Sequence, residues 1–267
     1  MTRPEPYVRE AGSGEAVVCI HANASSSGQW RALMDLLSST HHVVALDTYG
    51  SGKSPDWPSD RFISLADEVA FIEPVLARLQ SPVALVGHSY GAAVALKAAL
   101  TFPTRVRALV LYEPTLFAVL ATSTRLPTST DGIRKAITDA SSALDAGDRS
   151  SAAIAFIDYW MGDGSWANMP AHRRQAIEDS MVNVRRWGHA LFTEPAPIRA
   201  FQQLDVPVLY MVGKRSTASA LAVAETLISA LPRVRTIEFA NLGHMGPVTH
   251  PDVVNAEIKY FLQQVPC

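Results

Sequence analysis

The sequence has little of what marks secreted, membrane-spanning or disulfide-stabilised proteins. Its 267 residues include 2 cysteines, too few for a disulfide framework. Its apolar runs all fall short of about 18 residues, the length that a membrane-spanning helix requires. Residues 1–6 are polar and lack the apolar segment of a secretory signal. We therefore expect a reduced, cytoplasmic protein in which Cys19 is a core thiol and Cys267, the last residue, is exposed.

An excess of basic charge and the common metal-binding motifs are also absent. Lys and Arg number 23 against 25 Asp and Glu, the formal net charge is -2, and no run of five basic residues occurs. This composition gives no electrostatic basis for binding nucleic acid or an anionic membrane. Neither HExxH nor CxxC is present. We therefore expect no metal and no cofactor, and a small molecule as the partner.

The chain has instead a regular alternation of short apolar runs and helical segments. Apolar residues make up 48% of the sequence, enough for a sizeable core. Several of these runs, among them residues 16–20, 43–46 and 83–86, are continuously apolar, which is typical of strands buried on both faces of a sheet. Further strands are expected at residues 106–111, 206–213 and 234–239, and a short edge strand at 7–10. The alternation predicts an α/β fold with a mostly parallel, doubly wound sheet.

One long segment departs from this alternation and contains helical patterns only. It runs from residue 115 to 203, with helices expected at residues 130–144, 152–160, 171–187 and 197–203. We interpret it as a helical cap inserted between two strands of the sheet. The α/β core then consists of residues 1–114 and 204–267.

The sequence Gly-His-Ser-Tyr-Gly at residues 87–91 joins an apolar strand to an alanine-rich helix. A sharp strand-to-helix turn holds the serine, Ser89, in a strained conformation and exposes its hydroxyl group. Strand and helix then pass so closely that Cβ atoms at positions 87 and 91 would collide, which explains the two glycines. The helix N-terminus adds free N–H groups beside Ser89. This context favours a nucleophile; the alternative is a structural turn.

A second glycine-rich loop, at residues 47–55, invites comparison with phosphate-binding loops because it contains Gly52, Lys53 and Ser54. A P-loop requires a further glycine five residues before Gly52 and a helix after the lysine. Here the earlier position is Asp47, and Pro55 follows at once. The loop therefore does not predict nucleotide binding.

Several polar residues follow directly after predicted strands. They are Ser89, Glu113, His244 and the loop at residues 21–23 (His-Ala-Asn). In an open parallel sheet the binding site forms at the carboxyl ends of the strands. We therefore expect these residues to meet at one edge of the sheet.

With these motifs the sequence resembles the α/β-hydrolase fold family over nearly the whole chain outside the cap. The resemblance rests on residues 87–91, 21–23, 47–54 and 243–245. It implies that Ser89 is a nucleophile and His244 its general base, in the chain order serine, acid, histidine. His88 is expected to point away from Ser89 and either to support the site from behind or to serve packing, and His21 is expected to hold its loop by hydrogen bonding.

The resemblance also implies an oxyanion hole. One donor is the backbone N–H of Tyr90, and the other, by resemblance, is that of Asn23. Members of the family usually have glycine where this chain has Ala22. The alternative for Asn23 is a helix-cap or turn residue.

The expected acid is the point where the sequence departs from the family pattern. Most members carry Asp a few residues after the glycine that ends the penultimate strand, but residues 213–220 contain no carboxylate. Some members, including a subset of haloalkane dehalogenases, place the acid after the preceding strand, where this chain has Glu113. We expect Glu113 to orient His244. The alternative is a Ser–His dyad in which Glu113 pairs with a basic group or lines the cap hinge.

The nucleophile indicates the reaction class. Epoxide hydrolases and haloalkane dehalogenases attack with Asp at this position, whereas Ser89 implies an acyl-enzyme that water hydrolyses. The resemblance therefore implies a carboxylesterase with a small-molecule ester as substrate. The alternatives are a C–C bond hydrolase, a cofactor-free haloperoxidase-like enzyme, and a non-catalytic binding protein of the same fold.

The cap sequence bears on the size and polarity of the substrate. It contains large apolar residues, of which we expect most to be core and a minority to line a pocket above Ser89. These residues are Phe117, Leu120, Phe156, Tyr159, Trp160, Met161, Trp166, Met169, Met181, Trp187 and Phe192. A pocket of this kind predicts an apolar acyl or alcohol group of small to medium size.

Overall fold

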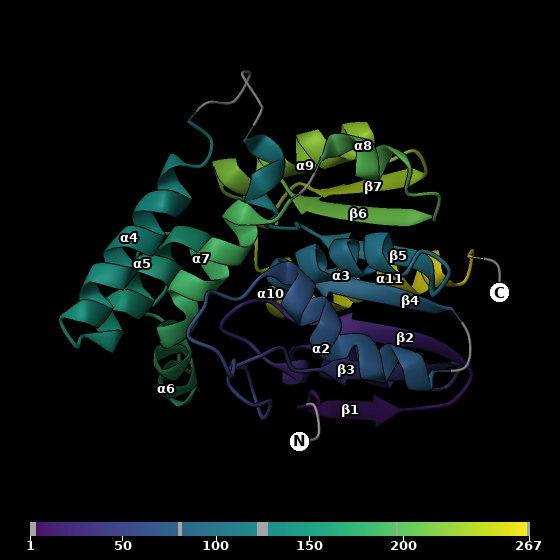
Figure 1. Ribbon diagram of the computed structural model, residues 1–267, viewed down its shortest axis with the longest axis horizontal. Helices are drawn as coiled ribbons and strands as arrows, with labels where there is room; N and C mark the ends of the chain where they lie inside the picture. The colour runs from purple at the N-terminus through teal and green to yellow at the C-terminus, as the bar shows by residue number, and fades with distance from the viewer. Residues whose placement is uncertain (1–3, 80–81, 122–127, 196, 266–267) are drawn as a thin grey trace.

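The protein is built around a seven-stranded sheet (Figure 1). The computed structural model describes residues 4–79, 82–121, 128–195 and 197–265, so that the expectation for Cys267 lies outside the described residues. The strands occur in the order β1-β3-β2-β4-β5-β6-β7. Their bounds are Val8–Ala11 (β1), Glu15–Ile20 (β2), His41–Leu46 (β3), Val83–His88 (β4), Val106–Tyr112 (β5), Val208–Gly213 (β6) and Val234–Phe239 (β7).

The pairing of the strands confirms the predicted sheet. β1 pairs antiparallel with β3 at one edge, and every other neighbouring pair is parallel. Helices cover both faces: α2, α3 and α9 on one, and α1 and α11 on the other. Their bounds are Arg31–Leu37 (α1), Leu65–Arg78 (α2), Tyr90–Thr101 (α3), Ala218–Ala230 (α9) and Pro251–Leu262 (α11), with short helices at Ser27–Trp30 (η1) and Gly246–Thr249 (α10).

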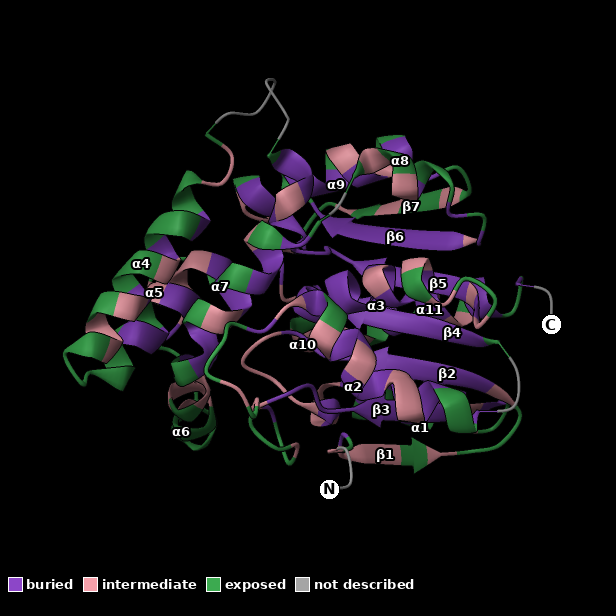
Figure 2. Ribbon diagram, viewed as in Figure 1, coloured by how far each residue is buried: buried purple, intermediate pink, exposed green. Residues whose placement is uncertain are grey.

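Side chains alternate between these two faces, as the geometry of a strand requires. Val18 of β2 and Leu85 of β4 pack on the side of α2 and α3, whereas Val17 and Val86 pack on the side of α1 and α11. All four are buried, and Figure 2 shows β2, β4 and β6 buried along nearly their whole length. Burial on both faces explains why residues 16–20 of β2 and 83–86 of β4 are continuously apolar in sequence. Cys19 is fully buried in β2, as expected of a core thiol.

Between β5 and β6, the described residues form helices and connecting loops but no strand. Their bounds are Phe117–Leu120 (η2), Asp131–Asp145 (α4), Arg149–Met161 (α5), Ala171–Ser180 (α6), Met181–Asn183 (η3), Val184–Thr193 (α7) and Ile198–Gln202 (α8). Helices α4 to α7 form a layer beyond the carboxyl ends of the strands, whereas α8 lies beside α9 (Figure 1). We call the segment from η2 to α7 the helical layer.

One expected helix of this layer is divided in the structure. The sequence predicted a single helix at residues 171–187, but α6 ends at Ser180 and α7 begins at Val184, with η3 between them. Helix α6 buries none of its residues, whereas α7 buries Val184, Trp187 and Leu191 among others. Of these two helices, only α7 has a face of buried apolar side chains that packs against the core.

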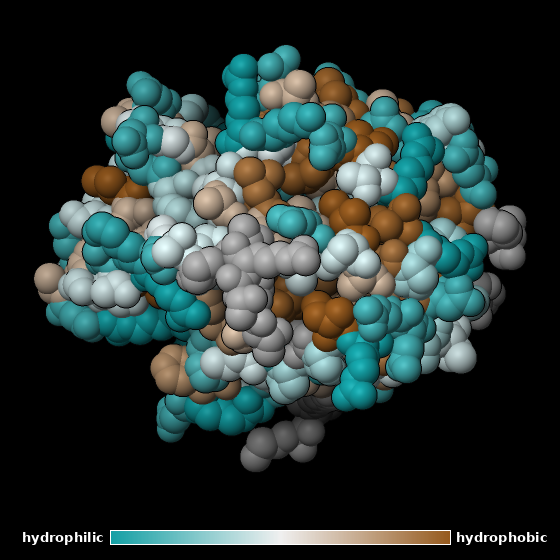
Figure 3. Space-filling model, turned by 90° about the horizontal axis from the view of Figure 1, so that it is seen from above, coloured by the Kyte–Doolittle hydropathy of each residue, from teal (hydrophilic) through white to brown (hydrophobic). Residues whose placement is uncertain are grey.

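The face of the molecule over α8 and α9 is of mixed polarity. Seen from above, over α8 and α9, apolar side chains form several groups separated by hydrophilic ones (Figure 3). Within the described ranges, no helix combines the length and the apolar character needed to cross a membrane.

Candidate active site

Ser89 occupies a tight turn between β4 and α3. Its φ and ψ angles are 56° and -115°, a left-handed conformation that non-glycine residues rarely adopt. A Cβ atom added to Gly87 would overlap the backbone of Ala92, and one added to Gly91 would overlap the carbonyl group of Ile20. The crowding expected at this turn is therefore present, and it explains both glycines.

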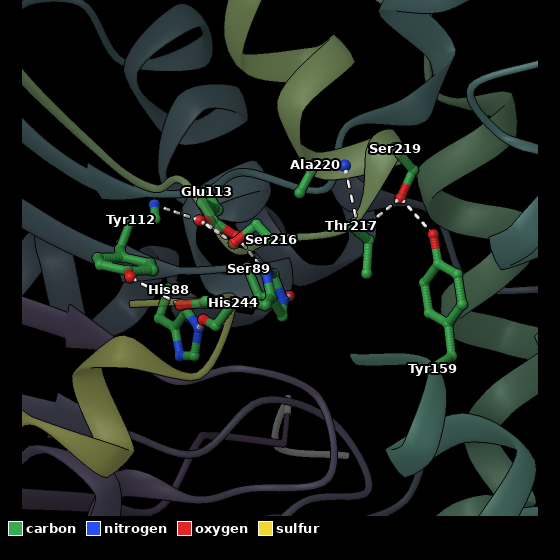
Figure 4. A network of polar contacts seen from close by, with 12 residues as sticks. His88, Ser89, Tyr112, Glu113, Tyr159, Ser216, Thr217, Ser219, Ala220 and His244 are labelled. Carbon is green, nitrogen blue, oxygen red and sulfur yellow. Dashed lines mark hydrogen bonds and ion pairs between the residues drawn. The ribbon is translucent and has the colours of Figure 1, made fainter. Parts of the chain in front are cut away.

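The structure brings the predicted serine, histidine and carboxylate together (Figure 4). His244 Nε2 lies 2.9 Å from Ser89 Oγ, and His244 Nδ1 lies 2.7 Å from Glu113 Oε2. Because a carboxylate can only accept, Nδ1 carries the proton and Nε2 is free to accept the hydroxyl hydrogen of Ser89. All three side chains are buried, with exposed fractions of 4% or less. This arrangement is the geometry of an activated nucleophile.

The second oxygen of Glu113 is held by the loop that follows β6. Oε1 accepts a hydrogen bond of 2.7 Å from the Gly213 N–H and one of 2.5 Å from the Ser216 hydroxyl group. This is the loop in which the family pattern would place a carboxylate. It supplies donors instead, and these satisfy a carboxylate that is wholly buried. The structure thus favours Glu113 as the partner of His244 over a dyad.

Backbone strain is concentrated at this site. Among the described residues, the non-glycine residues with positive φ are Ala24 (54°), Ser89 (56°) and Glu113 (44°). Ser89 and Glu113 belong to the hydrogen-bonded chain, and Ala24 follows Asn23 on the wall of the adjoining cavity. Strained conformations cost about 1–3 kcal/mol each and persist where the surrounding structure enforces them. The three strained residues therefore lie in or beside one site, the cavity next to Ser89.

The side chain of His88 connects two loops of the site through hydrogen bonds to Gln29 and to the His244 carbonyl group. Its Nε2 lies 2.8 Å from the carbonyl oxygen of His244 and must donate, and its Nδ1 accepts from the Gln29 amide at 3.1 Å. Gln29 Oε1 in turn accepts from the Ala22 N–H at 3.2 Å. Burial lowers the pKa of His88 well below its ordinary value, with His244 nearby as a further cause. A neutral His88 therefore links the His244 loop to the loop at residues 21–24.

The loop at residues 21–24 is held at its start by His21, as expected. His21 Nδ1 lies 2.6 Å from the Ala22 carbonyl oxygen, and Nε2 accepts the Thr48 N–H at 3.2 Å. Burial lowers the pKa of His21, so that one nitrogen donates and the other accepts. Asn23, whose N–H is the proposed oxyanion donor, lines the same cavity as Ser89.

Tyr90 begins α3, and its side chain contacts a buried carboxyl group that the sequence did not reveal. The Tyr90 hydroxyl donates to Glu68 Oε1 at 3.1 Å, and the Tyr49 N–H donates to Glu68 Oε2 at 3.3 Å. Burial raises the pKa of Glu68 to about 8. Glu68 therefore ties the residue after Ser89 to the glycine-rich loop. In sequence it is one of two acidic residues in a helical first turn, which gives no sign of burial.

The glycine-rich loop is closed on itself. Asp47 Oδ2 accepts the Lys53 N–H at 2.9 Å, and Asp47 Oδ1 accepts the Ser27 N–H at 2.5 Å. A Cβ atom on Gly52 would overlap the Asp47 carboxylate. An N–H group that a P-loop would offer to phosphate is thus used by an aspartate. The loop instead contributes Gly50, Ser51 and Gly52 to the cavity beside Ser89.

A cavity of about 650 Å³ lies between Ser89 and the helical layer. The core side of its wall is largely polar and includes Asn23, Ser25 and Ser26, whereas the helical layer contributes mostly apolar side chains. Six of the eleven large apolar residues singled out in the cap sequence line it: Phe117, Phe156, Trp160, Met161, Met169 and Trp187. The prediction that only a minority of these eleven residues line the pocket was therefore wrong. The helices enclose a hollow, so that one side chain can pack in the layer and also line the cavity.

No metal site is formed by the part of the chain that the structure describes. In those residues, no group of three or more His, Cys, Asp or Glu side chains is placed to hold a metal ion. The polar groups at the cavity instead form the hydrogen-bonded chain of Glu113, His244 and Ser89.

Fold and site together agree with one protein family. The sequence model of the alpha/beta hydrolase fold family matches residues 15–251. The chain therefore belongs to the alpha/beta hydrolase fold family.

Relatives matched over most of their length are named as esterases and hydrolases. The chain is 24% identical over 286 residues to a pimeloyl-[acyl-carrier protein] methyl ester esterase of Aliivibrio fischeri, covering 99% of each protein. It is 28% identical over 261 residues to a 2-hydroxy-6-oxo-6-(2'-aminophenyl)hexa-2,4-dienoic acid hydrolase of Metapseudomonas resinovorans, covering 94% of this chain and 85% of the relative. An esterase of Exiguobacterium antarcticum shares the fold, with a TM-score of 0.80, 20% identity, and coverage of 97% of this chain and 96% of that one. These relatives support a hydrolase.

Proposed function

We propose that the protein is a serine carboxylesterase that cleaves small to medium-sized apolar esters through an acyl-enzyme. The observation that carries the proposal is the hydrogen-bonded chain from Glu113 through His244 to Ser89, beside a cavity whose wall on the side of the helical layer is mostly apolar. A relative named as a methyl ester esterase, matched over 99% of both proteins, supports ester hydrolysis.

In the first half of the reaction, Ser89 Oγ attacks the carbonyl carbon of the ester. The hydroxyl proton passes to His244 Nε2, and Glu113 stabilises the imidazolium through the bond to Nδ1. Negative charge develops on the carbonyl oxygen, where the backbone N–H groups of Tyr90 and Asn23 are the proposed donors. One such donor is worth about 3–4 kcal/mol of barrier. The tetrahedral intermediate then expels the alcohol, which takes the proton from His244.

In the second half, water replaces the alcohol. His244 Nε2 accepts a proton from the water molecule as its oxygen attacks the acyl carbon. The second tetrahedral intermediate collapses, the carboxylic acid leaves, and the proton returns to Ser89 Oγ. The same oxyanion donors and the same Glu113 contact serve both halves.

The cavity sets the proposed substrate class. A volume of about 650 Å³ accommodates a small or medium-sized ligand. Phe156, Met161 and Trp187 offer apolar contacts, whereas Asn23 and Ser25 lie on the core side. The ester group would lie at Ser89, and its apolar part would point into the helical layer.

Hydrolysis of a p-nitrophenyl ester series tests this proposal. We expect turnover of the acetate, butyrate and octanoate. For acyl groups of similar length, kcat/KM should be higher for apolar esters than for esters that bear a charged group. Ser89→Ala should lower kcat/KM by at least about 10⁴-fold. Ser229→Ala, which removes an exposed serine hydroxyl on α9, is the matched control and should leave activity unchanged. Equal turnover by Ser89→Ala and wild type would exclude Ser89 as the nucleophile.

A C–C bond hydrolase is the second candidate. It is supported by the relative named as a dienoic acid hydrolase, which is 28% identical. The same Ser89 and His244 would serve it, so the comparison must be made with substrates. Turnover of a 2-hydroxy-6-oxo-dienoic acid with kcat/KM far above that for every p-nitrophenyl ester would favour this second function.

A further inference from the structure

An aromatic side chain from the helical layer lies on the imidazole ring of His244. Trp160, near the end of α5, stacks on His244 with ring centroids 4.0 Å apart and an interplanar angle of 25°. Trp160 is 9% exposed and also lines the cavity. Through this contact the helical layer touches the imidazole ring of His244, the middle member of the hydrogen-bonded chain of Glu113, His244 and Ser89.

The position of Trp160 is fixed by its neighbours on α5. The Tyr159 hydroxyl is hydrogen-bonded at 2.7 Å to Ser219 Oγ at the start of α9, and Ser219 Oγ lies 3.1 Å from Thr217 Oγ1 (Figure 4). Within α5, Trp160 makes edge contacts with Tyr159 at 4.9 Å and with Phe156 at 6.3 Å between ring centroids. The indole ring is therefore held by both its helix and the core.

The anchor of α5 and the anchor of Glu113 lie in one short segment. Ser216 donates to Glu113, and Ser219, three residues later, is hydrogen-bonded to both Tyr159 and Thr217. The imidazole of His244 is thus bounded by Glu113 at its Nδ1 edge and by Trp160 on a ring face, and residues 216–219 contact both Glu113 and Tyr159, the neighbour of Trp160. Figure 4 shows the hydrogen-bonded groups on either side of this segment.

We propose that Trp160 is a positioning residue for His244. Its indole face keeps the imidazole in the plane that joins Glu113 to Ser89, and it stabilises the imidazolium that forms when Ser89 transfers its proton. The second part rests on the proposed function. The proton moves from Ser89 Oγ to His244 Nε2, and no further reactant is needed.

The groups around the imidazole fit this role. Glu113 contacts Nδ1, Ser89 contacts Nε2, and the ring of His88 lies 5.2 Å away at 46°. Because burial keeps His88 neutral, it adds no positive charge against a protonated His244. A cation on an aromatic face is stabilised by the ring quadrupole, most strongly on tryptophan. Trp160 is the partner that supplies such a face.

The test compares Trp160→Leu with Trp160→Phe, because phenylalanine keeps an aromatic face and leucine does not. The first measurement is the rate at which a small fluorophosphonate labels Ser89, which reads the Ser–His pair without ester turnover. We expect Trp160→Leu to label about 2- to 30-fold more slowly than wild type, the range of a cation–π contact, and Trp160→Phe to recover most of the rate. With p-nitrophenyl acetate the loss should fall on kcat more than on KM.

Trp166→Leu is the matched control. Trp166 is a buried tryptophan of the helical layer that does not line the cavity, so that its loss reports on packing alone. We expect it to label at the wild-type rate. If Trp160→Leu does not fold, as judged by its Tm, Trp160→Met serves as the non-aromatic variant. A folded non-aromatic variant that labels as fast as wild type overturns the proposal.

The two proposals fail separately. If wild type is labelled by the fluorophosphonate but hydrolyses no ester, the carboxylesterase proposal is wrong and the test of Trp160 still stands. If esters are hydrolysed and the aromatic and non-aromatic variants label equally, the role of Trp160 is wrong and the esterase proposal is untouched.

Discussion

Replacing Glu113 by glutamine changes one functional atom and gives the sharpest test of the site. Glu113 Oε2 accepts from His244, whereas Oε1 accepts from both Gly213 and Ser216. Glutamine has a single side-chain oxygen, and the position facing two donors will take it. Its NH₂ group then faces His244 Nδ1, which must accept. The imidazole proton moves to Nε2, and Nε2 can no longer take the proton of Ser89.

The size of the effect follows from this change of tautomer. In another serine hydrolase, an acid-to-amide change that leaves the geometry intact lowers kcat by about 10⁴-fold. We expect Glu113→Gln to lower kcat/KM for p-nitrophenyl butyrate by about 10³- to 10⁴-fold, or about 4–5.5 kcal/mol of barrier. Tm should change little, because the donors of Gly213 and Ser216 keep their acceptor.

Steady-state kinetics and thermal unfolding of the same preparations provide the assay. Glu225→Gln, an exposed position on α9, is the matched control and should retain wild-type kcat/KM. A folded Glu113→Gln variant with activity within tenfold of wild type would refute the reasoning. His244 would then act without an orienting carboxylate, as a Ser–His dyad.

Two further predictions concern groups outside the Ser89–His244–Glu113 chain. Burial raises the pKa of Glu68 from 4.5 to about 8, so between these values the folded chain holds a proton that the unfolded chain has lost. The free energy of unfolding should therefore fall as pH rises through this interval, by at most about 5 kcal/mol, and urea unfolding at pH 5 to 8 should show no such fall in Glu68→Gln. Gln29→Ala breaks the link between Ala22 and His88, and it should lower kcat by about tenfold by displacing the loop at residues 21–24, which carries the proposed oxyanion donor. Unchanged kcat in a folded variant would contradict that link.

Sequence patterns predicted most of the architecture because backbone geometry demands particular residue types. A sheet buried on both faces needs apolar strands, and residues 83–86 and 108–111 are continuously apolar. The turn at Ser89 excludes a Cβ atom at positions 87 and 91, which only glycine satisfies. Such requirements are local, so they can be read from a short stretch of sequence. They predicted the sheet and the turn, and they placed Glu113 and His244 at the same edge.

The groups that were not predicted make contacts between residues that lie far apart in the sequence. Gln29 and Glu68 lie in helical segments where an amide or a carboxyl group is ordinary, and only the fold brings them against His88 and Tyr90. The stacking of Trp160 on His244 joins residues 84 positions apart, from two separate segments of the chain. No periodicity or motif encodes such a contact. The break between α6 and α7 was missed because both segments favour helix locally.

The unusual place of the acid follows from the sheet. β5 and β6 are parallel neighbours in which Tyr112 pairs with Met211, so their carboxyl ends open side by side at one edge. A carboxylate from either loop can therefore reach His244. Here the loop after β6 donates to Glu113 from Gly213 and Ser216, and a second carboxylate in the place of the Ser216 hydroxyl would oppose the first at close range. Like charges at such a distance disfavour ionisation. The missing aspartate in residues 213–220 and the glutamate at position 113 are thus two parts of one arrangement.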